Sequence, residues 1–104
     1  IEHMHNPQNA LMHQKIHAKV IQEVTPILTK IVNDGIEQNL IDTPFPYETV
    51  EMILVYANTI FDEAIIVATE KEQQKRIEAF AYNIERLFGI KTGELSIYIL
   101  KIFE

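Results

Sequence analysis

The sequence predicts an all-α fold, an antiparallel bundle of about four to five helices forming a single domain over residues 1–104. Apolar residues recur at helical spacing in several long segments. Prolines and glycines separate these segments, most clearly at Pro26, Pro44, Pro46 and Gly89. The chain has 104 residues, of which 47% are hydrophobic and 23% charged, a composition that suits one globular domain with its own core.

The first helix is predicted to run from Asn6 or Asn9, either of which can act as the N-cap, to about Val24. Residues at i, i+4, i+7 and i+11 give this segment one continuous face, with further apolar residues beside it. The face contains His13, His17, Val20 and Val24, widened by Leu11, Met12 and Ile16.

Thr25-Pro26 predicts the start of a second helix, because threonine is a favoured N-cap and proline is favoured at the first helical position. One continuous helix with a kink at Pro26 is the alternative, since an interior proline removes a backbone hydrogen bond. The segment ends near Asn39, which tolerates the left-handed conformation of a helix C-cap. Its apolar residues are Ile27, Leu28, Ile31, Val32 and Ile36.

A loop is predicted over residues 40–46, because the residue before each of Pro44 and Pro46 is disfavoured in the α region. A third helix then spans about Pro46–Thr69 and is apolar on nearly its whole circumference. Such a helix must be buried nearly all round, which indicates that a second subunit covers part of it. One side carries Val50, Ile53, Leu54, Ala57, Phe61, Ala64, Ile65 and Ala68, and the other carries Met52, Val55, Tyr56, Ile60 and Val67.

The fourth helix is predicted over about Glu70–Phe88, with Gly89 as its C-cap. The remaining residues, 92–104, are apolar and β-branched, and their pattern fits either a short packed helix or an extended tail. The apolar stripe of the fourth helix contains Ile77, Phe80, Ala81, Ile84, Leu87 and Phe88.

No catalytic motif is found, so we expect that the chain is not an enzyme and needs no cofactor. Ser96 is the only serine and lies far in sequence from every histidine, and no glycine-rich phosphate loop is present. Carboxylates scattered among polar residues are typical of a solvated surface. We assign that role to Glu48, Glu51, Glu63, Glu78 and Glu85.

His13 and His17 are four residues apart, the spacing at which two ligands on one helix can face the same metal ion. The chain has no cysteine, and no Glu-x-x-His pattern of carboxylate metal bundles accompanies the pair, so we expect no metal site. The two imidazoles either lie at a pocket, where they would hydrogen-bond a ligand, or are ordinary histidines that face solvent or have local partners.

Composition restricts the possible partners. The net charge is −6 at pH 7, and the nine cations form no concentrated stripe, so these residues are not expected to bind DNA by themselves. No apolar run approaches the ~20 residues that span a bilayer, so no membrane contact is expected, and no signal peptide is recognisable. The absence of cysteine fits a reducing cytoplasm, where we expect the protein.

Two segments carry a family pattern when taken together. The first, TPILTKIVNDGIEQNLIDTPFPYETVEMIL (Thr25–Leu54), has a proline, an apolar pair, Gly-Ile, a short proline-containing loop and a Thr-Val helix opening. The second is RIEAFAYNIERLFGIKTG (Arg76–Gly93). In this order they resemble the C-terminal domain of TetR-family bacterial transcriptional regulators, the second segment being similar to the family's last helix. Asn39 stands where many relatives have glycine, a change that the left-handed conformation tolerates.

The resemblance implies where two functions lie. In the family, the last two long helices of each subunit pack against their symmetry mates as a four-helix dimer interface, and the preceding helices line the ligand cavity. The implied dimer-interface residues are Val50, Ala57, Phe61, Ala64, Ile77, Ala81, Ile84 and Phe88. The implied ligand-binding residues are His13, Ile16, His17, Val20, Ile31 and Tyr56.

On this interpretation the chain is the regulatory domain of a TetR-like regulator. It would form a homodimer and bind a small, largely apolar effector, which would shift the spacing of two DNA-reading domains. The helix-turn-helix domain is missing from these residues, so the chain would be a truncated C-terminal part, and DNA would be contacted only through the absent domain. The alternative is a stand-alone helical adaptor that binds a partner helix in a groove and has no small-molecule site.

Overall fold

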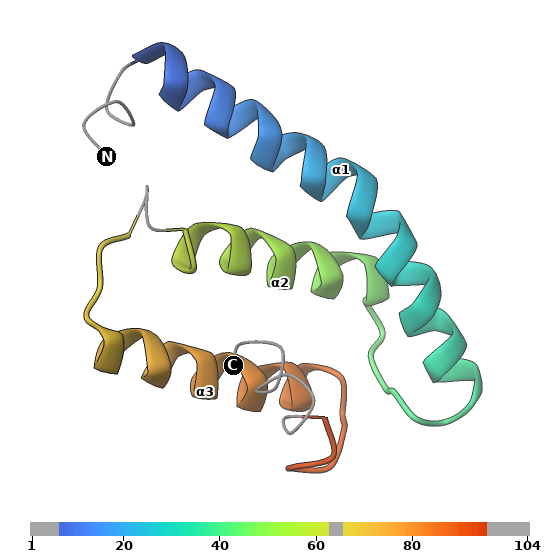
Figure 1. Cartoon of the computed structure of the whole chain (residues 1–104). Helices are drawn as coiled ribbons and strands as arrows, with labels where there is room; N and C mark the ends of the chain where they lie inside the picture. Colours follow the sequence, from blue (N-terminus) through green and yellow to red (C-terminus); the bar gives the residue numbers. More distant parts are fainter. Residues whose placement is uncertain (1–6, 63–65, 96–104) are drawn as a thin grey trace.

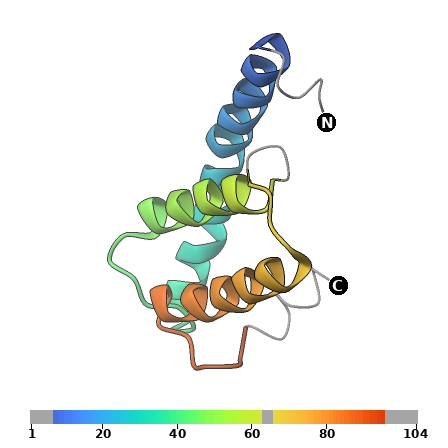
Figure 2. The same cartoon turned by 90° about the vertical axis from the view of Figure 1, so that its left-hand side faces the viewer.

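The computed structural model describes residues 7–62 and 66–95. Within these ranges it contains three helices, α1 (Pro7–Glu37), α2 (Pro46–Ile60) and α3 (Glu70–Leu87), and no strand. The all-α prediction is confirmed, although three helices stand in the described ranges where four to five were expected. Helices α2 and α3 run antiparallel beside each other, and the long helix α1 crosses α2 (Figure 1, Figure 2).

The residues predicted to form the first two helices are one continuous helix, α1, with Pro26 in its interior. The predicted helix start at Thr25 is therefore wrong, and the alternative of a single helix is the one observed. Proline offers no N–H to the carbonyl of Gln22 four residues earlier, so α1 continues here without that backbone hydrogen bond. In the same part of the helix the carbonyl of Thr25 accepts a hydrogen bond from Thr29 Oγ1 at 2.7 Å. Thr25 is fully buried and Pro26 is exposed. Packing of this turn therefore outweighs the local preference for a helix break.

Helix α1 ends in the predicted left-handed cap. Asn39 has a φ of 61°. The N–H of Leu40 donates to the carbonyl of Gly35 at 2.9 Å, and that of Asn39 donates to the carbonyl of Ile36 at 3.0 Å. This pair of bonds is the Schellman motif, which satisfies the last carbonyls of a helix. A Cβ on Gly35 would lie only 2.6 Å from Cδ1 of Ile41, so this glycine lets the returning loop pack on the last turn.

Helix α2 begins at Pro46, as predicted, but it ends at Ile60 and does not continue to Thr69. The reason lies in the start of α3. Oγ1 of Thr69 accepts the N–H of Glu72 at 3.1 Å, while the carboxylate of Glu72 accepts the N–H of Thr69 at 2.9 Å. This capping box is a strong helix-start signal, and the β-branched residues Ile66 and Val67 before it have reduced helix propensity.

Helix α3 agrees with the predicted fourth helix, and Gly89 has a φ of 64°, which confirms the predicted C-cap. Residues 92–95 form turns. The rest of the tail, residues 96–104, lies outside the described residues, so its conformation stays undecided.

The core lies where the second half of α1, the first turns of α2 and the end of α3 meet. Its buried members are Val32, Val50, Ile84 and Phe88. Partly buried residues packed against them are Leu28, Ile36, Ile41, Ile53, Leu54, Phe80, Ile90 and Leu95. The loop between α1 and α2 contacts the core at the end of α3, where the N–H of Asp42 donates to the carbonyl of Phe88 at 2.8 Å.

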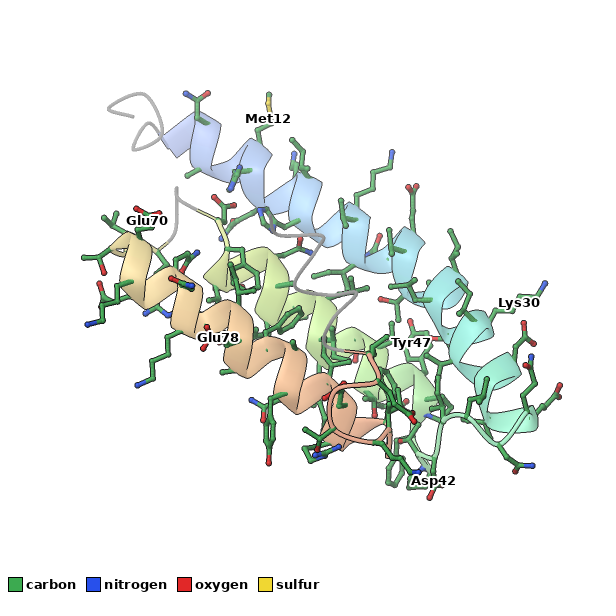
Figure 3. The ribbon with its side chains drawn as sticks, turned by 60° about the horizontal axis from the view of Figure 1, so that its bottom comes forward. Met12, Lys30, Asp42, Tyr47, Glu70 and Glu78 are labelled. Carbon is green, nitrogen blue, oxygen red and sulfur yellow. The ribbon has the colours of Figure 1, made fainter. Side chains whose placement is uncertain are left out.

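The first half of α1 extends away from this core (Figure 2). It carries an exposed apolar stripe, and Met12 in Figure 3 points away from α2 and α3. The stripe continues along the helix at helical spacing as Met12, Ile16, Val20, Ile27 and Ile31. No helix in the described ranges combines the length and apolar character that a membrane span needs.

One of the carboxylates assigned to a solvated surface is buried. Glu85 is fully buried, because the segment after Gly89 folds back over it, and its carboxylate accepts the N–H groups of Gly93 and Leu95. The prediction for Glu85 is therefore wrong. Glu48, Glu51 and Glu78 are exposed as expected, and Glu63 lies outside the described residues.

Candidate functional site

Two predicted ligand-binding residues, His13 and His17, converge on a third residue that the sequence does not single out, Asp62. Nε2 of each imidazole lies within hydrogen-bonding distance of the same carboxylate oxygen, Oδ2 of Asp62, at 2.7 Å from His17 and in direct contact from His13. The two Nε2 atoms are 3.2 Å apart. Three potential ligand atoms therefore meet at one point.

Local structure explains how these side chains meet. His13 and His17 are one turn apart on α1, so they share a face, and their rings lie with centroids 4.6 Å apart. Asp62 follows the end of α2. The N–H of Phe61 donates to the carbonyl of Ala57 at 3.2 Å, and the carbonyl of Asp62 accepts the N–H of Ile66 at 2.9 Å. These backbone bonds hold Asp62 where α2 reaches the first half of α1 (Figure 1).

The cluster is half-buried and borders open space. The side chains of His13, His17 and Asp62 keep 29%, 22% and 15% of their exposure. A hollow of about 510 Å³ beside them is lined by His17, Ala57, Asn58, Phe61 and Asp62. Nδ2 of Asn58 is buried and has no hydrogen-bond partner among the described residues. The hollow thus presents a carboxylate and an imidazole to anything that enters it.

The six predicted ligand-binding residues do not form one cavity. His13 and His17 belong to the cluster with Asp62. Ile16, Val20 and Ile31 are exposed on α1, at 55%, 38% and 59%. Tyr56 lies on the other side of α2 from Asn58, between two hollows.

Tyr56 belongs to an aromatic group that links α2 to α3. Its ring stacks on Phe80 with centroids 5.7 Å apart and planes 15° apart. Phe61 meets Phe80 edge-on at 5.4 Å and Tyr56 edge-on at 6.3 Å. Such arrangements are favourable beyond the area that they bury. The three rings therefore set the spacing between α2 and α3.

Apolar hollows border Tyr56 on both sides. One, of about 390 Å³, lies between α2 and α3 and is lined by Met52, Ile53, Tyr56, Phe80, Asn83, Ile84, Arg86 and Leu87. We call it the α2–α3 cleft. The other, of about 550 Å³, lies between α1 and α2 and is lined by Ile21, Glu48, Glu51, Met52, Val55, Tyr56, Thr59 and Ile60. We call it the α1–α2 hollow. Met52 and Tyr56 belong to both.

The predicted dimer-interface residues have different environments in one chain. Val50, Ala81, Ile84 and Phe88 are buried within it. Ala57, Phe61 and Ile77 are half-buried, and Ala64 lies outside the described residues. The large apolar side chains that α2 and α3 leave exposed are Tyr47, Met52, Val55, Tyr56, Tyr82 and Leu87. Any surface that α2 and α3 offer to a partner is therefore made chiefly of these exposed side chains, and less of the residues predicted from the sequence.

Sequence reasoning missed Asp62 and Asn58. Both fall inside the helix predicted over Pro46–Thr69, where a lone polar residue is typical of ordinary surface. Asp62 is 45 residues away from His17. A helix end after Ile60 would have freed Asp62 to turn toward α1, and the capping box at Thr69 was the available signal for such an end.

Comparison with known protein families identifies a matching domain. The family model described as the tetracycline repressor-like C-terminal domain matches residues 1–84. Neither the curated proteins nor the solved structures gave a match. The matched part contains α1, α2, the histidine–aspartate cluster and most of α3. Since the match covers well over half of the chain, this protein belongs to the family of tetracycline repressor-like C-terminal domains, the regulatory domains of TetR-type transcriptional regulators.

Proposed function

We propose that this domain forms a homodimer in a cytoplasmic, non-enzymatic transcriptional regulator and binds a small, largely apolar effector that controls DNA binding by a helix-turn-helix domain. The observation that carries the proposal is the apolar outer face of α2. Met52, Val55 and Tyr56 are 52%, 46% and 39% exposed there, between two apolar hollows. Family membership supports the general role of a regulatory domain.

The α2–α3 cleft is the proposed dimer surface. Met52 and Leu87 stand exposed along it, and Ile53, Phe80 and Ile84 form its floor. A cleft between two antiparallel helices can accept the ridge of another helix. In a two-fold dimer each α2 would supply that ridge to its mate, since an isologous interface uses the same surface twice.

The α1–α2 hollow is the proposed effector site. Its walls are mostly apolar, through Ile21, Val55 and Ile60, and its volume falls within the range of ligand pockets. Glu48 and Glu51 also line it, so an effector with a hydrogen-bond donor or a cationic group would fit best. Among the predicted ligand-binding residues, Tyr56 lines this hollow directly.

Tyr56 couples the two sites in this proposal. It lines the hollow and the cleft, and its ring stacks on Phe80 of α3. An effector that contacts Tyr56 would favour one position of this stack and therefore one spacing of α2 and α3. A ligand shifts a conformational equilibrium only through such a difference in affinity between the two states.

The dimer is tested by the molar mass in solution, measured by light scattering. We expect about 24 kDa, twice the 12.1 kDa of the chain. Met52→Glu places a charge on the cleft without disturbing the core and should halve the mass. Ile27→Glu makes the same change at a position 62% exposed on α1 and should leave the dimer intact. A monomeric wild-type chain would contradict the dimer and favour the helical adaptor.

Effector binding is tested by a thermal-shift screen of small apolar amines and alcohols, followed by calorimetry. Val55→Ser should weaken any hit, because Val55 lines the α1–α2 hollow and is too exposed to support the fold. Ile27→Ser is the matched control on α1 and should bind like the wild type. Hits that bind Val55→Ser unchanged would place the effector site elsewhere.

A further inference from the structure

We propose that His13, His17 and Asp62 form a binding site for one divalent transition-metal ion of the zinc class. Two imidazole Nε2 atoms and one carboxylate oxygen would hold the ion. These three residues form the only group of three or more histidine and acidic side chains, within the described ranges, whose potential ligand atoms all lie within 4.8 Å of one another. The proposal is independent of the apolar effector and of the dimer.

The two nitrogens have the separation that a tetrahedral metal site requires. Zn–N bonds are about 2.0–2.1 Å long, so two ligands of a tetrahedral ion are about 3.3 Å apart. Nε2 of His13 and Nε2 of His17 are 3.2 Å apart. The two residues are one turn apart on a continuous helix, and their rings already lie side by side, with centroids 4.6 Å apart, before an ion binds.

Asp62 occupies the third corner. Its Oδ2 lies 2.7 Å from Nε2 of His17, a hydrogen-bond distance shorter than the edge of the tetrahedron. An ion bound between the three atoms would move the carboxylate outward from both imidazoles, by about 0.6 Å relative to His17. The hollow beside Asp62 leaves room for such a movement.

The hollow also provides the open side of the site. With three protein ligands, a zinc ion keeps a fourth position for water or another molecule. Asn58 lines the same hollow, and its buried amide nitrogen lacks a partner among the described residues. Because this nitrogen is covered, the Asn58 side chain would have to turn toward the hollow to donate a hydrogen bond to a water on the ion. Metal-bound ligands are commonly supported by such outer groups.

The donor set selects the class of metal. Imidazole nitrogen suits Zn²⁺, Cu²⁺, Ni²⁺ and Fe²⁺, whereas Mg²⁺ and Ca²⁺ require oxygen ligands. The chain contains no cysteine, so a thiolate cannot complete the set. The absence of a nearby third ligand in the sequence was the reason to expect no metal, and the fold supplies that ligand from the end of α2.

A bound ion would join the first half of α1 to the end of α2. This half of α1 lies beyond the core, and its outer face is exposed. An ion that binds the folded chain more tightly than the unfolded chain raises the melting temperature as its concentration rises. We therefore expect Zn²⁺ to stabilise the domain.

The experiment uses the whole chain with His3→Gln and His5→Gln, which leaves His13 and His17 as its only histidines. Calorimetric titration with ZnCl₂ should show one ion per chain, and MgCl₂ should give no binding. Affinity should fall roughly tenfold or more in His17→Ala and in Asp62→Asn. Asp34→Asn removes the same charge from an exposed position far along α1 and should not change the affinity.

A second measurement identifies the atoms. In long-range nitrogen–proton NMR spectra of the same chain, Zn²⁺ should shift the Nε2 signals of both histidines and leave their Nδ1 atoms protonated. Failure of Zn²⁺ to bind, or equal binding by a His13→Ala/His17→Ala variant, would overturn the proposal. The three residues would then form only a hydrogen-bonded contact between α1 and α2.

Discussion

The carboxylate of Glu85, in the last turn of α3, accepts a hydrogen bond from the backbone N–H of Leu95 at 2.8 Å. The N–H of Gly93 donates to the same carboxylate at 3.0 Å. Glu85 is fully buried, and Leu95 packs against the core. A buried carboxyl group therefore holds the segment that turns back from Gly89 and closes one side of the core.

Replacing Glu85 should destabilise the fold strongly. Glu85→Ala leaves two partly buried N–H groups without this acceptor and a cavity in place of a fully buried side chain, and we expect a loss of about 3 kcal/mol in the free energy of unfolding. Urea denaturation followed by circular dichroism measures it. Glu78→Ala, an exposed change on the same helix, should stay within about 0.5 kcal/mol. Equal effects of the two variants would show that the hydrogen bonds of Glu85 do not contribute.

The capping box at the start of α3 gives a second prediction. Thr69→Ala removes the hydroxyl that accepts the N–H of Glu72, and we expect a loss of about 1 kcal/mol at neutral pH. The backbone N–H of Thr69 donates to the Glu72 carboxylate and, with the Thr69 side chain, lowers the pKa of Glu72 below its ordinary value.

This lowered pKa fixes the sign of the pH dependence. The folded state favours the charged form of Glu72, so its contribution is complete above the ordinary glutamate pKa of about 4.3 and is lost as the pH falls through the lowered value. Thr69→Ala should therefore cost more stability at pH 7 than at pH 3. An NMR titration should also show the pKa of Glu72 rising in this variant, and an unchanged pKa would contradict the capping box.

Replacing Gly89 should strongly lower the free energy of unfolding. Its φ is +64°, and a Cβ there would lie 3.2 Å from Cβ of Asp42 and 3.3 Å from its carbonyl oxygen. We expect Gly89→Ala to cost about 2–3 kcal/mol, from left-handed strain and crowding together. Gly93→Ala is the control, because its φ is +93° but nothing lies within 4 Å. It should cost about 1–2 kcal/mol, and a larger loss than for Gly89→Ala would refute the crowding.

Thr25 offers the opposite case, a substitution that should be tolerated. Its side chain is fully buried, and Oγ1 has no hydrogen-bond partner among the described residues. Thr25→Val keeps the shape and removes the buried hydroxyl, so we expect no loss of stability or a gain of up to about 1 kcal/mol. Thr29→Val loses the bond from Oγ1 to the Thr25 carbonyl and should cost about 0.5–1 kcal/mol. A greater loss for Thr25→Val would mean that its hydroxyl has a partner.

The sequence predicted the helical parts of the fold well because those signals are local. Pro46 begins α2, and Asn39 and Gly89 adopt positive φ after α1 and α3, as expected. The prediction failed at Pro26, where two helices were expected, and after Ile60, where one long helix was expected. At Pro26 the local preference was outweighed by burial of Thr25. After Ile60 the sequence does contain a signal for a new helix, the capping box of Thr69 and Glu72, but the prediction did not include it.

The candidate site was predicted only in part. His13 and His17 were placed on one face by their spacing, and that is a property of the helix alone. Their partner Asp62 could not be inferred, because it is distant in sequence and lies beyond the end of α2. The apolar outer face of α2 was predicted from its pattern, whereas the burial of Val50 and Ile84 within one chain was not.

The sequence by itself determined that the protein is helical, where most helices begin and end, and which family it resembles, since periodicity, capping residues and family motifs each act over a few neighbouring residues. Only the tertiary structure decided that Pro26 lies within a helix, that Glu85 is buried, and that Asp62 meets the two histidines. The physical reason is that burial and side-chain contacts depend on which distant surfaces pack together. An apolar or charged pattern shows that a face needs a partner, but it does not identify that partner.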